Sequence, residues 1–197
     1  MTEFPSYIHF GIVNGSFYCD KCASLKSLKG APKKVGRDFS CNFCTSLESL
    51  EGAPEKARDF SCNNCDSLKS LEGAPKMVDG CFYCNSCNSL KSLMGAPEKV
   101  GDGFYCLWCT SLKSLEGAPK EVGMDFGCIS CTSLTSLEGA PKKVGGNFFC
   151  RDCTSLTSLE GAPKEVGGNF ECSSCPLLTS LEGISERING KIYSDIR

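Results

Sequence analysis

Pairs of cysteines spaced as Cys-x-x-Cys recur along this chain of 197 residues, and thiol chemistry is the first chemistry that they suggest. Cys19 and Cys22 are followed after 18 residues by Cys41 and Cys44, which matches the spacing of a four-cysteine zinc site. Zinc, copper(I) or an iron–sulfur cluster held between neighbouring pairs is therefore one interpretation. The candidate ligands would be Cys19, Cys22, Cys41, Cys44, Cys62, Cys65, Cys84, Cys87, Cys106, Cys109, Cys128, Cys131, Cys150, Cys153, Cys172 and Cys175.

A second interpretation needs no metal. The pairs belong to a repeat of 22 residues, so the zinc-like spacing follows from the repeat itself and is not independent support for a metal site. Free cysteine packs well as a small buried hydrophobe, and the Phe, Leu and Val of the repeat already supply a core. We therefore favour the paired cysteines as core residues and expect no cofactor, with metal ligation as the alternative and disulfides third.

Cys81 stands outside the pairs. It occupies a position that other repeats fill with Asp, Asn, Ser, Gly or Lys, which are residues typical of a solvent-facing position. We predict that Cys81 is the reactive thiol of this chain. A thioredoxin-like role for the paired cysteines is disfavoured, because that chemistry uses a thiolate at a helix N-terminus and no helix is indicated.

The elements that position the cysteines follow from the repeat, Phe-x-Cys-x-x-Cys-x-Ser-Leu-x-Ser-Leu-x-Gly-Ala-Pro-x-x-Val-Gly-x-x. Alternation in Phe-x-Cys predicts a short strand with Phe and Cys inside, and Gly-Ala-Pro predicts a turn. The step between units is 22 residues except where a glycine is missing at Ala57-Arg58-Asp59. Since such units bury their apolar faces only by stacking, we predict a single-domain parallel β-solenoid of about nine coils with little regular helix.

The repeat also predicts how the chain is divided. Residues 1–12 would form an N-terminal cap, residues 13–187 a solenoid with eight Cys-x-x-Cys units, and residues 188–197 a degenerate ninth coil and C-terminal cap. Atypical ends are expected, because the terminal coils of a solenoid expose apolar area and unpaired strand edges.

The residues Phe148 to Leu156 resemble part of the leucine-rich-repeat consensus, and Cys153 to Leu159 with Pro163, Val166 and Phe170 look like its BspA-like class. Repeats such as residues 156–163 are also similar to repeats associated with phage and environmental genomes. This chain has one residue more than the usual consensus between the Cys and the next Leu. The resemblance implies a leucine-rich-repeat type of solenoid used for protein recognition; it supplies no catalytic residues, and the fold alone does not fix a function.

The variable positions around the strand suggest where a partner would bind, since apolar residues gather there in the middle repeats. Exposed aromatic patches mark binding sites, and Trp and Tyr are common hot-spot residues. The alternative is that these side chains only pack on one another along the sheet. The predicted partner-binding residues are Tyr83, Tyr105, Leu107, Trp108, Ile129, Phe149 and Phe43.

The composition excludes several function classes. A formal net charge of -2 gives no electrostatic basis for binding nucleic acid or an acidic membrane. No constellation of catalytic residues stands out, so we expect no enzyme. The first residues lack the pattern of a secretory signal and no apolar run could span a bilayer, which favours the cytoplasm, or a host cytoplasm if the chain is phage-encoded.

The leading hypothesis is thus a non-enzymatic module that binds a protein through its strand face. Two alternatives stay open: a metal-binding or thiol-storage protein built on the cysteines, and a structural subunit that forms homo-oligomers or stacks end to end into filaments.

Overall fold

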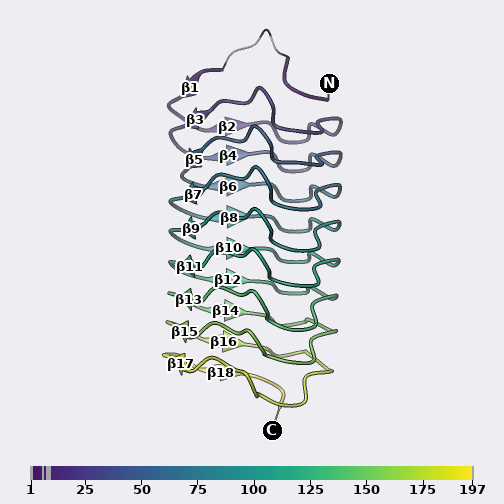
Figure 1. Ribbon diagram of the computed structural model, residues 1–197, viewed down its shortest axis with the longest axis vertical. Helices are drawn as coiled ribbons and strands as arrows, with labels where there is room; N and C mark the ends of the chain where they lie inside the picture. The colour runs from purple at the N-terminus through teal and green to yellow at the C-terminus, as the bar shows by residue number, and fades with distance from the viewer. Residues whose placement is uncertain (1, 6, 8–9, 197) are drawn as a thin grey trace.

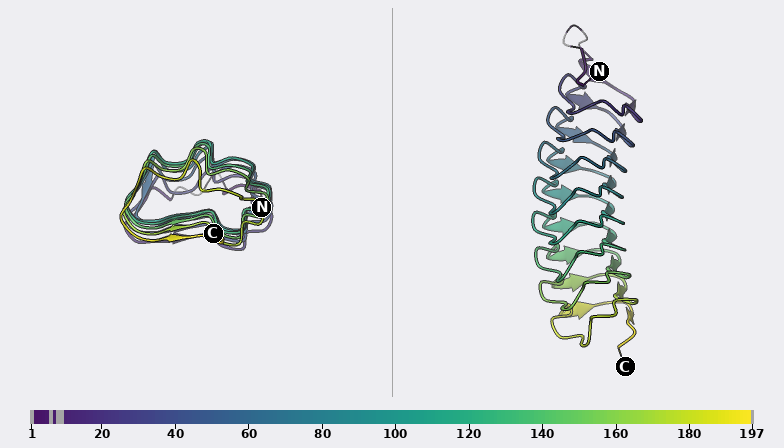
Figure 2. Two further views of the ribbon diagram at one scale, coloured as in Figure 1. Left: turned by 90° about the horizontal axis from the view of Figure 1, so that it is seen from below. Right: turned by 90° about the vertical axis from the view of Figure 1, so that its right-hand side faces the viewer.

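The computed structural model describes residues 2–5, 7 and 10–196, and it is a single-domain parallel β-solenoid (Figure 1). Each repeat makes one coil, and successive coils lie almost on top of one another when the molecule is viewed along its long axis (Figure 2). All strands have two residues, and no helix occurs in the described part of the chain. The predicted repeat solenoid is confirmed; residues 1, 6, 8 and 9 of the predicted N-terminal cap and residue 197 lie outside the described residues.

The first sheet is the predicted one and has nine strands. Each strand begins at the first apolar residue of Phe-x-Cys, and neighbouring coils pair in parallel with Phe opposite Phe, as in Phe104 beside Phe82 and Phe126. The outer surface of this sheet is called the strand face below. The strands are β2 (Phe17–Tyr18), β4 (Phe39–Ser40), β6 (Phe60–Ser61), β8 (Phe82–Tyr83), β10 (Phe104–Tyr105), β12 (Phe126–Gly127), β14 (Phe148–Phe149), β16 (Phe170–Glu171) and β18 (Ile192–Tyr193).

A second set of strands runs through the Val position of the repeat, where the sequence had suggested no strand. It is interrupted between β3 and β5, so that two strands pair separately from the other seven. The interruption adjoins the repeat that lacks one residue, since β5 contains Ala57 of Ala57-Arg58-Asp59. The strands are β1 (Ile12–Val13), β3 (Lys34–Val35), β5 (Lys56–Ala57), β7 (Met77–Val78), β9 (Lys99–Val100), β11 (Glu121–Val122), β13 (Lys143–Val144), β15 (Glu165–Val166) and β17 (Arg187–Ile188).

The core consists of columns, meaning the same repeat position in successive coils. The Phe rings from Phe39 to Phe170 are fully buried and stack with centroids 5.1–5.4 Å apart. The two cysteine columns, the two leucine columns and the Val column fill the rest of the interior. Stacked, offset rings and close-packed aliphatic side chains bury apolar area that no single coil could bury alone.

Backbone geometry restricts two positions of the repeat. The glycine after Val has no room for a side chain: a Cβ on Gly123 would lie 1.7 Å from the carbonyl oxygen of Gly101 in the preceding coil. The residue before the second Cys is held in the left-handed region in every coil, with φ between 55° and 60°. That conformation is unfavourable for residues other than Gly, Asn and Asp. A bulky residue at this position therefore strains the backbone.

Candidate partner-binding site on the strand face

The aromatic centre of the strand face lies on β8 and β10. The rings of Tyr83 and Tyr105 are stacked with their centroids 5.4 Å apart and their planes 12° from parallel. The glycines beside Tyr105 leave it room, because a Cβ on Gly103 would lie 2.4 Å from the Tyr105 ring and a Cβ on Gly127 3.2 Å from it. Both tyrosines are half-buried.

Trp108 is placed beside this centre at a backbone conformation that disfavours it. Its φ is 57°, in the left-handed region, and its side chain is 52% exposed. Five other coils carry small polar residues in the same column, namely Asn64, Ser86, Ser130, Asp152 and Ser174, and the first two coils carry Lys21 and Phe43. A bulky residue in the left-handed region is a genuine outlier, and an exposed side chain recovers little of the strain by packing.

Side-chain ladders, which the sequence analysis missed, line both sides of the strands. In the first ladder a side-chain oxygen in the column after the first Cys accepts the backbone N–H of the same position in the next coil, at 2.7 or 2.8 Å. The acceptors are Asp20, Asn42, Asn63 and Asn85. A second ladder of the same kind and the same distances occupies the column before Phe, with the acceptors Asp59, Asp125, Asn147 and Asn169.

Both ladders are interrupted in the same coil. Leu107 ends the first ladder: its N–H donates to Asn85, but its own side chain has no polar atom that could accept the N–H of Ile129 in the next coil. Cys81 and Gly103 interrupt the second ladder between Asp59 and Asp125. The coil of Gly103, Tyr105, Leu107 and Trp108 therefore lacks both acceptors. Leu107 occupies one ladder position of this coil, and at the other the ring of Tyr105 lies where a side chain on Gly103 would be.

Five of the seven predicted residues gather here. Leu107 packs toward Gly127, where a Cβ would lie 2.8 Å from its Cδ2 atom, and Ile129 follows Leu107 in the same column. The name "aromatic patch" is used below for the residues Tyr83, Tyr105, Leu107, Trp108 and Ile129.

Two predicted residues lie at a distance from this centre. Phe149 is two coils from Tyr105, with Gly127 between them in the sheet. Phe43 is 48% exposed with φ 59°, but Asn64 and Ser86 separate it from Trp108 along their column. Phe43 is thus an exposed aromatic residue that lies apart from the others. The order of residues within its column already indicated this separation.

Both tyrosines of the aromatic patch keep their protons at neutral pH. A hydrogen bond with Cys81, followed by partial burial, raises the pKa of Tyr83. Partial burial, followed by the negative charge of Asp125, raises the pKa of Tyr105 to about 12. The patch therefore offers uncharged hydroxyl groups, which can donate hydrogen bonds beside apolar surface.

The paired cysteines are oriented into the core. Their thiols donate to backbone carbonyls of neighbouring coils, as from Cys109 Sγ to Cys84 O at 3.1 Å and from Cys106 Sγ to Gly127 O at 3.4 Å. Burial raises the pKa of Cys84 and Cys150 well above the ordinary thiol value. Such thiols stay protonated and neutral at neutral pH.

No group of three or more His, Cys, Asp or Glu side chains in residues 2–5, 7 and 10–196 is arranged to hold a metal ion. Within the same residues every cysteine is a free thiol. Cys81 is partly exposed, and its N–H donates to Asp59 Oδ1 at 2.8 Å. Cys22 in the first coil is exposed as well, which the sequence analysis did not anticipate. The equivalent cysteines of later coils are buried, because each has a neighbouring coil on both sides.

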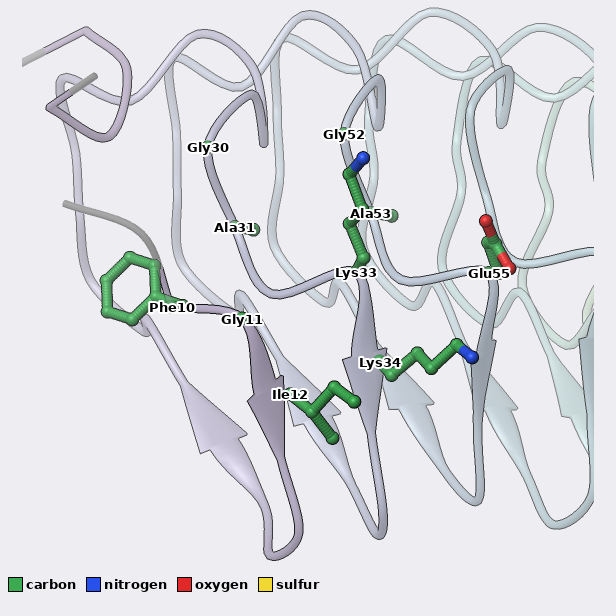
Figure 3. A pocket seen from close by; sticks show the side chains of 10 residues that line it. All are labelled: Phe10, Gly11, Ile12, Gly30, Ala31, Lys33, Lys34, Gly52, Ala53 and Glu55. Atoms are coloured by element: carbon green, nitrogen blue, oxygen red, sulfur yellow. The ribbon is translucent and has the colours of Figure 1, made fainter. Parts of the chain in front are cut away.

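A groove of about 750 Å³ lies near the N-terminal coils, on the side of the second sheet (Figure 3). Phe10, Ile12 and Ala31 contribute apolar walls, and Lys33, Lys34 and Glu55 contribute charged groups of both signs. This groove shares no residue with the aromatic patch.

No protein-family model, curated protein or solved structure matches this chain. None of the described segments forms a helix of the length and hydrophobicity required to cross a membrane.

The burial of the thiols predicts their reactivity. In the folded protein we expect two of the 17 thiols, Cys22 and Cys81, to react readily with Ellman's reagent, and the others only after denaturation. Peptide mapping after a brief treatment with iodoacetamide identifies the modified positions. Rapid modification of Cys84, Cys106 or Cys150 in the folded protein would contradict the buried, protonated state described above.

The backbone strain at Trp108 gives a second prediction. Because asparagine tolerates the left-handed conformation and already occupies this column at Asn64, Trp108→Asn should stabilise the protein by about 0.5–1 kcal/mol. Urea denaturation of the two proteins measures the difference. A loss of more than about 1 kcal/mol would instead show that Trp108 is required for packing.

Proposed function

We propose that the protein is a non-enzymatic interaction module that binds another protein through the aromatic patch. The observation that carries the proposal is Trp108: a large exposed aromatic residue, beside the stacked tyrosines, in a strained backbone conformation that small polar residues occupy in five of the other seven coils of this column. A residue retained against local stability is better explained by a contact with a partner than by the fold.

The surroundings of Trp108 support the same function. The stacked Tyr83 and Tyr105 form a rigid platform with little side-chain entropy left to lose on binding. Leu107 and Ile129 add apolar area beside it, and both are only partly buried. Protein interfaces combine such central aromatic and aliphatic residues with a polar rim, which the asparagine ladder at Asn63 and Asn85 would provide.

Charge and resemblance favour a protein as the partner. The formal net charge of -2 provides no attraction for nucleic acid or anionic lipid. The resemblance of the repeats to the leucine-rich class supports protein recognition, since stacked repeats offer extended binding surfaces.

The test uses substitutions that the repeat itself already contains. Tyr105→Ser introduces the residue that the same column carries at Ser61. Trp108→Ser introduces the residue that its column carries at Ser86 and Ser130. The wild-type protein serves to capture binding proteins from cells that express it. Each captured protein is then purified, and calorimetry gives its dissociation constant for wild type and variants. We expect the double variant to bind at least about 30-fold more weakly, as for a hot spot of roughly 2 kcal/mol.

Phe43→Asn is the matched control, because it removes an exposed aromatic residue from the same column, three repeats away from Trp108. It should leave the dissociation constant within about twofold. Equal affinity of the wild type and the double Ser variant for the partner would refute the proposal, as would a partner that depends on Phe43 instead.

A further inference from the structure

The aromatic patch has two chemically different ends. Leu107, Trp108 and Ile129 follow the first Cys of their coils and form an apolar end. The ring of Tyr105 extends toward the other end, because a Cβ on Gly103 would lie 2.4 Å from its Cε2 atom and 2.6 Å from its hydroxyl oxygen. The hydroxyl group of Tyr105 therefore lies over the residues that precede β10, whereas Trp108 follows that strand.

Two carboxylates lie at the hydroxyl end of the patch. Asp102 immediately precedes Gly103 in the chain, and Asp125 occupies the position equivalent to Gly103 in the next coil. Partial burial, followed by the charge of Asp125, raises the pKa of Tyr105; a hydrogen bond with Asp125 and the charge of Asp102 raise it further. Both carboxylates are thus close to the Tyr105 hydroxyl group. We call Asp102, Asp125 and this hydroxyl group the acidic end.

The chain supplies no cation to the acidic end. Among the described residues no lysine or arginine forms an ion pair with Asp102 or Asp125. Elsewhere on the strand face a cation accompanies the carboxylate, as Arg58 Nε lies 3.9 Å from Asp59 Oδ2. The two coils of the acidic end carry no lysine or arginine between the Val and the second Cys. The surface is therefore locally negative beside the tyrosines, and it attracts a positively charged group.

An apolar surface adjoins the two carboxylates. Met124 donates its N–H to Asp102 O at 2.8 Å, so the two residues are neighbours in successive coils, and Met124 is 55% exposed. A well-matched ligand would combine a positive charge, several hydrogen-bond donors and an aliphatic stem. Arginine has this combination, because its planar fork of N–H groups bonds carboxylates in pairs and its stem packs on apolar surface. Lysine offers a point charge without the fork.

We propose that the acidic end binds an arginine side chain of the partner protein, while an apolar side chain of the same partner segment packs on Leu107 and Trp108. This inference rests on the proposed function, since it specifies the chemistry of the protein that the aromatic patch would bind. Charge complementarity supports it: two carboxylates without a cation adjoin aromatic and apolar surface, where a guanidinium group gains both ion pairing and contact with aromatic rings. Arginine is also common among the hot-spot residues of protein interfaces.

The test uses a ligand that can be obtained before any natural partner is known. Peptides that bind the wild-type protein are selected from a displayed library of random dodecapeptides, and those without tryptophan are synthesised. Trp108 is the single tryptophan of the chain, so a change in its fluorescence on titration reports binding at the patch. We expect the selected peptides to contain an essential arginine. Its replacement by citrulline, which removes the charge and keeps the shape, should weaken binding at least about tenfold.

Aspartate variants test the same contact from the side of the protein. Asp102→Asn and Asp125→Asn each remove one charge, and asparagine already occupies the column of Asp125 at Asn147, where it accepts the equivalent backbone N–H. The double variant should bind the arginine peptides about tenfold more weakly and the citrulline peptides as wild type does. Asp79→Asn is the matched control, because Lys56 Nζ lies 2.9 Å from Asp79 and already neutralises it. It should leave the dissociation constant unchanged.

One variant keeps the test independent of folding. Asp102 is exposed and its side chain takes part in neither ladder, so Asp102→Asn should retain the melting temperature of wild type. It should weaken the arginine peptides about threefold, and the effect should shrink as salt is added. This variant decides the question if the double variant melts at a lower temperature.

The possible results separate this inference from the proposed function. Peptides that lose affinity in the double variant Tyr105→Ser, Trp108→Ser, but not on citrulline replacement or in the aspartate variants, would overturn the arginine contact and leave the proposed function standing. Peptides that tolerate all of these changes would contradict both. A preference for lysine over arginine, or a selection that enriches no binding peptide, would also overturn the inference.

Discussion

Register between coils is the constraint on which the rest of this structure depends. Each coil hydrogen-bonds the next at equivalent positions, so one residue type per column is repeated along the molecule. The Phe stack is a direct consequence: rings 5.1–5.4 Å apart are buried by their neighbours in the coils before and after. The Phe column and the two Cys columns are buried from Phe39 to Cys175, and a residue that departs from its column is noticeable at once.

The register also explains the abundance of cysteine and the position of the aromatic patch. Between the Phe and Leu columns the interior has room for small apolar residues whose thiols reach carbonyls of adjacent coils, as from Cys109 to Cys84. On the outside the same register lets an asparagine bond the next coil, and the ladders from Asp20 and Asp59 reinforce the backbone. The coil of Tyr105 and Trp108 lacks this reinforcement, and the proposed binding function would account for that loss as an exchange of stability for binding.

The repeat made most of the fold predictable, and the failures have physical causes. The burial of Phe104, Cys106 and Leu112 followed from the pattern and is confirmed. The strands at Lys99–Val100 and its equivalents were missed because two residues show no alternation. The ladders were missed because asparagine in a loop position is equally typical of a turn. Tyr83, Tyr105 and Trp108 were identifiable as candidates from their columns, whereas the strain at Trp108 needed backbone angles.

The measurement that tests the account most directly is oxidative footprinting of the aromatic side chains with and without the bound partner. Trp108 and Tyr105 should lose reactivity in the complex, while Phe43 and Tyr18, which are exposed on the same side outside the aromatic patch, should react at unchanged rates. Unchanged oxidation of Trp108 together with protection of Phe43 or Tyr18 would contradict the account, because the partner would then bind away from the coil in which both ladders are interrupted.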